Sequence, residues 1–229
     1  MDKQLKDKAA KRVPQADAEV LKAVESRQTT MTASYLMSLS SETVHEALKI
    51  LYAKQRGISS KDVSANKGLN DSLATISFIL TTKPQYASIF LTGEGGSGKT
   101  EIFNAIFELF KIAKELDADN GCQIFAYSDL EEAVLFYNLQ FFRYEENPTR
   151  LLYNLTEAAV LLLDNFGMED GTPEENNNID RFIHDVLMIR RDLGVPTILA
   201  SQFDIESLRD WYGPAVADLI ESRYTTIEL

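Results

Sequence analysis

The sequence has few of the residues that build disulfide frameworks and metal centres. Of its 229 residues, one is cysteine and two are histidine. An internal disulfide is therefore excluded, and so is a zinc site made of cysteines. We expect the single thiol, Cys122, to be a buried residue at the start of a strand.

Long apolar runs are lacking as well. No stretch approaches the roughly 18 apolar residues that a membrane-spanning helix needs, and Met1–Arg12 is charged where a signal peptide would be apolar. We expect a soluble, cytoplasmic protein that makes no membrane contact. The hydrophobic share of 45% is that of a globular protein. The length allows one full domain with an appendage, or two small domains.

Positive charge is scarce beyond the first 60 residues. The formal net charge is −12; residues 1–60 carry ten Lys/Arg against seven Asp/Glu, whereas residues 61–229 carry 13 against 28. Cations supply most of the affinity for a nucleic-acid backbone, so such an acidic region binds DNA poorly by itself. DNA contact would need local basic spots, an oligomer surface or the N-terminal arm. Alternatively, the acidity only keeps the protein soluble.

Residues 1–84 are expected to form a small helical region that contacts a partner or DNA. The first 28 or so residues are polar and fit a frayed helix or a mobile arm. From Ser41, apolar residues recur on one helix face and Gly57 ends the pattern. A second helix is expected from about Leu69 to Leu80.

Residues 85–229 alternate between strand and helix patterns. The expected strands are Ile89–Thr92, Gln123–Tyr127, Val160–Leu163, Thr197–Ala200 and Tyr224–Leu229. Helices are expected over residues 100–114, 150–156 and 179–193, and two short helices precede the last strand. A further helix is expected to start at Asp129, with Ser128 as its N-cap, and to run toward a break at Asn147-Pro148. Such alternation predicts an α/β fold with a parallel sheet covered on both faces. The uninterrupted apolar run of Val160–Leu163 is typical of a central buried strand.

A glycine-rich loop carries the strongest functional signal. It follows the first strand, opens a helix, and reads Gly93-Glu94-Gly95-Gly96-Ser97-Gly98-Lys99-Thr100. Such a loop wraps backbone amides around phosphates, Lys99 reaches the β- and γ-phosphates, and the Thr100 hydroxyl binds Mg²⁺. The expected cofactors are ATP and Mg²⁺. The expected nucleotide-binding residues are Gly93, Glu94, Gly95, Gly96, Ser97, Gly98, Lys99, Thr100 and Glu101.

Two residues after the buried strand complete the predicted catalytic centre. Asp164 is expected to hold Mg²⁺ together with Thr100. Asn165 stands where many ATPases of this type carry a carboxylate that activates water, and an amide can orient water but cannot accept its proton. Slow hydrolysis, with ATP acting as a binding switch, is one consequence. Alternatively, Glu169 or Asp170 supplies the missing base.

Three further polar sites each have a functional and a structural interpretation. Ser201-Gln202 follows the fourth strand, where it senses the γ-phosphate or positions water, or else simply caps the strand. Arg223 serves the γ-phosphate of a neighbouring subunit, or forms a surface salt bridge. Arg190-Arg191 contacts DNA or a neighbour's nucleotide, or lies on a solvated helix face.

The C-terminal third of the chain resembles a known family of ATPases. Pro196–Gln202, Trp211, Ala217–Arg223 and Ile227–Leu229 look like the end of the IstB transposition helpers and of their relatives, the DnaC-type helicase loaders. Leu151–Leu155 and Leu161–Gly167 are similar to the second nucleotide motif of the same clade. The resemblance covers roughly residues 85–229.

This resemblance implies a P-loop NTPase with an AAA+ core. Its five-stranded parallel sheet has the order 5-1-4-3-2 between helices, and no C-terminal lid follows. Lys99, Thr100 and Asp164 bind Mg-ATP, Ser201-Gln202 lies at sensor 1, and Arg223 is a finger that acts in trans within a ring or spiral homo-oligomer.

Two functions follow from these patterns. The first is an ATPase accessory to DNA replication or transposition, which acts on DNA with a replicative helicase or a transposase. The second is a nucleotide-gated interaction switch that hydrolyses little ATP and does not bind DNA.

Overall fold

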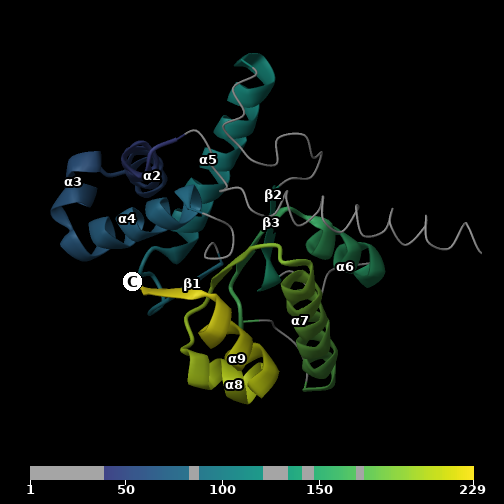
Figure 1. The fold of residues 1–229 in the computed structure, drawn as a ribbon. Helices are drawn as coiled ribbons and strands as arrows, with labels where there is room; N and C mark the ends of the chain where they lie inside the picture. The colour runs from purple at the N-terminus through teal and green to yellow at the C-terminus, as the bar shows by residue number, and fades with distance from the viewer. Residues whose placement is uncertain (1–38, 83–87, 121–133, 141–146, 169–172) are drawn as a thin grey trace, which may run out of the picture. The chain divides into compact units, whose positions relative to one another are not determined.

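The structure is a computed structural model that describes residues 39–82, 88–120, 134–140, 147–168 and 173–229 (Figure 1). All of them belong to the compact unit Ser34–Leu229. Several predictions fall outside the described residues: the N-terminal arm, Cys122, the strand Gln123–Tyr127, the cap Ser128, and the bases Glu169 and Asp170.

The described strands form one five-stranded parallel sheet. They are β1 (Ile89–Thr92), β2 (Val134–Asn138), β3 (Val160–Asp164), β4 (Thr197–Ala200) and β5 (Thr225–Glu228). Their order is β2-β3-β4-β1-β5, which confirms the predicted order read from the other edge. The carboxyl ends of β1, β3 and β4 therefore lie next to one another at the middle of the sheet.

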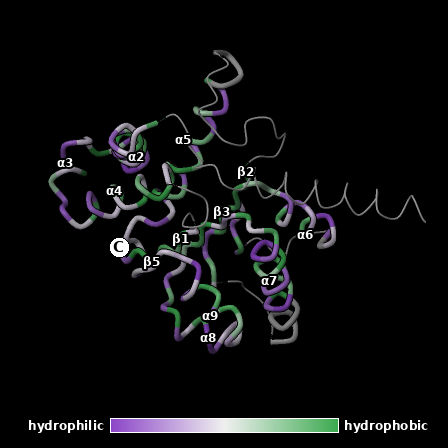
Figure 2. The backbone as a smooth tube through the Cα atoms, in the orientation of Figure 1, coloured by the Kyte–Doolittle hydropathy of each residue, from purple (hydrophilic) through white to green (hydrophobic). Residues whose placement is uncertain are grey.

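Helices cover both faces of this sheet (Figure 1). On one face lie α2 (Ser41–Arg56), α4 (Lys67–Thr81) and α5 (Lys99–Asn120); on the other lie α6 (Pro148–Glu157), α7 (Pro173–Leu193), α8 (Ile205–Tyr212) and α9 (Pro214–Arg223). Successive strand side chains point to opposite faces, so Leu162 packs in the first core and Leu161 in the second. Hydrophobic residues accordingly concentrate along β1 and β3 (Figure 2).

The predicted helix from Ser41 is α2. Ser40 caps its first turn by accepting a 3.1 Å hydrogen bond from the Thr43 amide. Gly57 ends the helix in the left-handed conformation, at φ 67°. The short helix α3 (Ser60–Ala65), which the pattern analysis does not predict, begins with a capping box between Ser59 and Asp62. Among the described helices, none is long and apolar enough to cross a membrane.

The helix predicted to start at Asp129 is wrong over Val134–Asn138. This segment is strand β2, which pairs with β3 from Val134 opposite Val160 to Asn138 opposite Asp164. A short apolar run does not distinguish helix from strand by periodicity alone. Here the aromatic and β-branched side chains fit a strand, and β3 provides the partner.

The interpretations of Arg190 as a contact to DNA, as a contact to a neighbour's nucleotide and as a solvated residue are all wrong. Its side chain is 1% exposed. It donates to the carbonyls of Ala158 at 2.6 Å and Pro196 at 2.5 Å, and to the Thr197 hydroxyl at 2.8 Å. The next residue, Arg191, is exposed and pairs with Asp192. Backbone carbonyls at the end of α6 and before β4 thus hold the Arg190 cation in the interior.

Candidate functional site

The loop between β1 and α5 requires glycine at particular positions. Gly93, Gly96 and Gly98 adopt φ values of 143°, 83° and 104°, which side chains rarely allow. A β-carbon on Gly98 would lie 2.5 Å from the Tyr52 hydroxyl, and one on Gly93 would lie 2.5 Å from the Leu229 carbonyl. The tight curl of the loop therefore depends on all three glycines for conformation, and on Gly93 and Gly98 also for space.

The Lys99 ammonium lies against this loop. Its Nζ donates to the carbonyls of Gly93 at 2.7 Å and Glu94 at 2.9 Å, and to the Ser97 hydroxyl at 3.2 Å. Burial lowers the pKa of Lys99, and the nearby carboxylates of Asp164 and Glu101 oppose that shift. A largely buried cation beside glycine amides is suited to neutralise an anionic ligand.

Thr100 and Asp164 meet at the carboxyl end of the sheet. The Thr100 hydroxyl donates a 3.0 Å hydrogen bond to Oδ2 of Asp164, and Oδ1 accepts one of 2.9 Å from the Asn165 amide. Burial raises the pKa of Asp164, while the hydrogen bonds from Thr100 and Asn165 and the Lys99 charge lower it. A hydroxyl and one carboxylate are oxygen ligands of the kind Mg²⁺ takes together with phosphate oxygens. The pair fits that ion.

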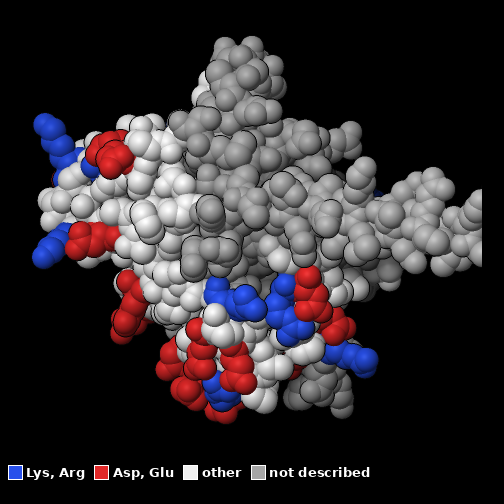
Figure 3. All heavy atoms as spheres, in the orientation of Figure 1, with Lys and Arg blue, Asp and Glu red and all other residues white. Residues whose placement is uncertain are grey.

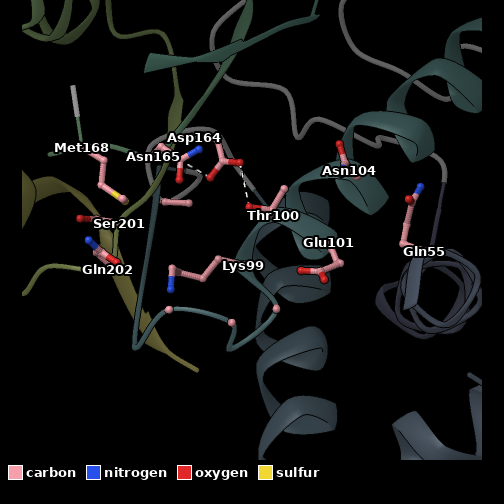
Figure 4. A pocket seen from close by; sticks show the side chains of 14 residues that line it. Gln55, Lys99, Thr100, Glu101, Asn104, Asp164, Asn165, Met168, Ser201 and Gln202 are labelled. Carbon is pink, nitrogen blue, oxygen red and sulfur yellow. Dashed lines mark hydrogen bonds between the residues drawn. The ribbon is translucent and has the colours of Figure 1, made fainter. Parts of the chain in front are cut away.

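A pocket of about 470 Å³ joins these groups (Figure 4). Its volume falls in the range of small-molecule sites. Most of the predicted residues meet in its wall: Gly95, Gly96, Gly98, Lys99, Thr100, Glu101, Asp164, Asn165, Ser201 and Gln202. Gly93, Glu94 and Ser97 line an adjoining hollow on the other side of the loop.

Solved structures share this architecture. A DNA replication initiation factor matches at 16% identity with a TM-score of 0.53, over 72% of this chain and 46% of its own. DnaA from Aquifex aeolicus, bound to AMPPCP, matches at 16% identity with a TM-score of 0.51, over 72% and 47%. The DnaC helicase loader matches at 19% identity with a TM-score of 0.48, over 72% and 91%.

The chain has the AAA+ fold. The AAA+ resemblance drawn from the sequence is confirmed at the level of fold. The chain spans about half the length of the initiation factor and of DnaA. Neither a protein-family profile nor a curated protein sequence matches it.

Asn165 is held in an unusual conformation in this AAA+ core. Its φ of 58° is in the left-handed region, which asparagine tolerates better than most residues. The side-chain Nδ2 donates a 3.1 Å hydrogen bond to Oδ1 of Asn138. Asn138 ends β2 opposite Asp164. Sequence reasoning missed Asn138 because its segment was predicted to be helical. The available signal was that Asn138 is a polar residue at the end of an apolar run, where strand ends carry site residues.

Ser201 and Gln202 have different environments. Ser201 is 1% exposed, and its hydroxyl donates to the Phe166 carbonyl at 2.6 Å and accepts from the Phe203 amide at 3.0 Å. These bonds tie the segment after β3 to the turn after β4. Gln202 faces the phosphate loop, where its Oε1 would lie 3.7 Å from a β-carbon on Gly95. Of the two residues, Gln202 is therefore the one placed to contact a ligand in the pocket, because the Ser201 hydroxyl is already engaged.

Arg223 lies apart from the pocket. It is an exposed residue in the last turn of α9, and it is not among the residues that line either side of the loop. An arginine that served the pocket of its own chain would have to line that pocket. Arg223 does not, and its exposed position leaves it accessible to another molecule.

The pocket is also lined by Gln55, Asn104 and Met168, which motif reasoning did not identify.

Proposed function

We propose that this chain is an ATP-binding AAA+ protein that hydrolyses ATP slowly. The observation that carries the proposal is the 3.0 Å contact between Thr100 and Asp164, beside a glycine loop that Lys99 covers. Those groups are the ones that a triphosphate and its metal ion require. Low turnover is expected because Asn165 cannot accept a proton from water.

Each residue has a defined task in the bound state. The amides of the loop and the N-terminal end of the 22-residue helix α5 hold the phosphates. Lys99 exchanges its bonds to the loop carbonyls for bonds to phosphate oxygens. Thr100 and Asp164 would hold Mg²⁺, which would neutralise charge that develops on the phosphates. Asn165, steadied by Asn138, orients a water molecule, and Gln202 contacts the terminal phosphate.

Calorimetry with Mg-ATP tests the binding step. We expect Lys99→Met to weaken ATP binding about tenfold or more, because a charge-assisted contact to phosphate is lost. Lys111→Met is the matched control, since Lys111 is an exposed lysine of the same helix that lies over the Phe107 ring and not in the pocket. Absence of heat with the unaltered protein would overturn the proposal.

We further propose a role in DNA replication as an accessory ATPase of the helicase-loader type. The resemblance to the IstB and DnaC-type proteins supports it, as does the likeness of fold to DnaA, which has been solved with AMPPCP and single-stranded DNA. The chain would assemble into a ring or spiral, with Arg223 reaching a neighbour's site, and act on DNA with a replicative helicase or, as a weaker alternative, a transposase.

One observation favours the second function, a nucleotide-gated interaction switch without DNA binding. Acidic side chains gather over α8 and α9 (Figure 3). Among them Arg209 is already paired with Asp218 at 2.7 Å and Glu221 at 3.2 Å. Arginines that are already paired with carboxylates on an acidic face contribute little affinity for the phosphate backbone of DNA.

DNA binding measured with and without ATP over a salt series separates the two. Binding that appears only with ATP and weakens as salt rises supports the replication role. ATP-dependent oligomers that ignore single- and double-stranded DNA support the switch.

A further inference from the structure

Helix α2, which precedes the sheet in the chain, lies against the phosphate loop. Tyr52, Gln55 and Arg56 are spaced i, i+3 and i+4, so they share one face of the helix. The Tyr52 hydroxyl occupies the space that a side chain on Gly98 would fill, 2.5 Å from such a β-carbon. Arg56 pairs with Glu101, in the first turn of α5, at 2.7 Å. These two contacts fix α2 to the loop and to α5.

Gln55, between those two contacts, reaches the pocket wall. Figure 4 shows Ser201 and Gln202 at one end of the pocket and Gln55 with Glu101 at the other. The pocket thus has one end formed by the segments after β3 and β4, and another formed by α2 and α5.

The two ends differ in chemistry. Lys99, Thr100 and Asp164 serve phosphates and metal. The α2 end has the amides of Gln55 and Asn104 and the Glu101 carboxylate, and the nearby Arg56 cation is neutralised by Glu101. A carboxylate repels phosphate, whereas amides donate and accept hydrogen bonds with neutral polar groups. Within the described parts of the chain, the Gln55 and Asn104 side chains have no hydrogen-bond partner of their own.

We propose that the α2 end of the pocket recognises the nucleoside part of the nucleotide, with Gln55 and Asn104 as hydrogen-bonding groups to the base or ribose. Tyr52 and Arg56 are positioning residues that hold Gln55 in the wall. This inference rests on the proposed ATP binding and adds to it. Discrimination between nucleosides then depends on a helix that lies outside the strand-and-helix core.

The test compares ligands that share the phosphates and differ in the nucleoside. Calorimetry on the full chain with Mg²⁺ measures ATP and inorganic tripolyphosphate for the unaltered protein, Gln55→Leu and Asn104→Leu. Loss of one hydrogen bond should weaken ATP binding about five- to tenfold and leave tripolyphosphate binding, whatever its strength, unchanged. Lys54→Leu is the matched control, because Lys54 is exposed on the same turn of α2 and does not line the pocket.

The outcomes distinguish the two levels of the proposal. Unchanged ATP affinity in both variants would overturn nucleoside recognition by these amides and leave the phosphate site intact. Equal losses for ATP and tripolyphosphate would also overturn it, because they would mean damage to the loop. Binding of neither ligand by the unaltered protein would overturn the nucleotide function itself. Circular dichroism confirms that each variant is folded.

Discussion

The Thr100 hydroxyl lies 3.0 Å from Oδ2 of Asp164, although the two residues are 64 positions apart in the chain. The sheet creates this contact, because β1 leads into the loop before Thr100 and β3 ends at Asp164. Asp164 is 2% exposed, and in the absence of a cation its burial opposes ionisation. The fold therefore places this carboxyl group, beside the Thr100 hydroxyl, where a bound cation would favour its ionisation.

We predict that Asp164→Asn stabilises the metal-free protein at neutral pH. The folded-state pKa of Asp164 is raised, so its contribution to stability is fully present below the unfolded pKa and is lost as pH rises through the folded pKa. Ionisation of the buried carboxylate as pH rises costs stability, and asparagine removes that cost while its carbonyl still accepts from Thr100. Urea unfolding in EDTA should give a higher midpoint. The substitution Asp192→Asn breaks only the exposed ion pair with Arg191 and should shift the midpoint little. A lower midpoint for Asp164→Asn would contradict the argument.

We predict that Asn165→Asp increases ATP turnover. Asn165 follows Asp164, the proposed metal ligand, and its side chain donates a 3.1 Å hydrogen bond to Asn138. A carboxylate at this position could accept a proton from water, and general bases contribute about 100-fold or more in favourable cases. We expect an increase of about tenfold or more in steady-state hydrolysis. Asn165→Ala serves as the control and should not accelerate the reaction. Unchanged turnover in Asn165→Asp would indicate that the missing base does not limit hydrolysis.

We predict that Arg190→Met destabilises the fold by about 3 kcal/mol or more. The substitution leaves the carbonyls of Leu155, Ala158 and Pro196 without their buried donor. Denaturant unfolding measures the loss. Arg191→Met changes the adjacent, exposed arginine and should stay within about 0.5 kcal/mol of the unaltered protein. Equal losses of stability in the two variants would show that the buried hydrogen bonds of Arg190 do not stabilise the fold.

We predict that Arg223→Ala preserves ATP affinity and lowers turnover about tenfold or more in assembled protein. The reason is its position, exposed at the end of α9 and outside the pocket of its own chain. Calorimetry, hydrolysis rates and sedimentation of the ATP-bound protein are the measurements. Arg150→Ala, at an exposed arginine of α6, is the control. Normal turnover together with normal assembly would remove Arg223 from the finger role.

The sequence by itself determined the parts of this protein that depend on local spacing. Glycine positions set the shape of the loop after β1, and the apolar run Val160–Leu163 between turn signals indicated a buried strand followed by Asp164. The alternation of strands and helices was enough to predict a parallel sheet with its polar residues at one edge.

Only the tertiary structure decided what depends on partners distant in the chain. It paired Val134–Asn138 with β3 and so brought Asn138 to Asn165. It buried Arg190 among backbone carbonyls and set Gln55 of α2 in the pocket wall. No local pattern contains these outcomes, because an isolated helix or strand carries the same residues whichever surface it meets. Hydrogen-bond and packing partners exist only after the elements assemble.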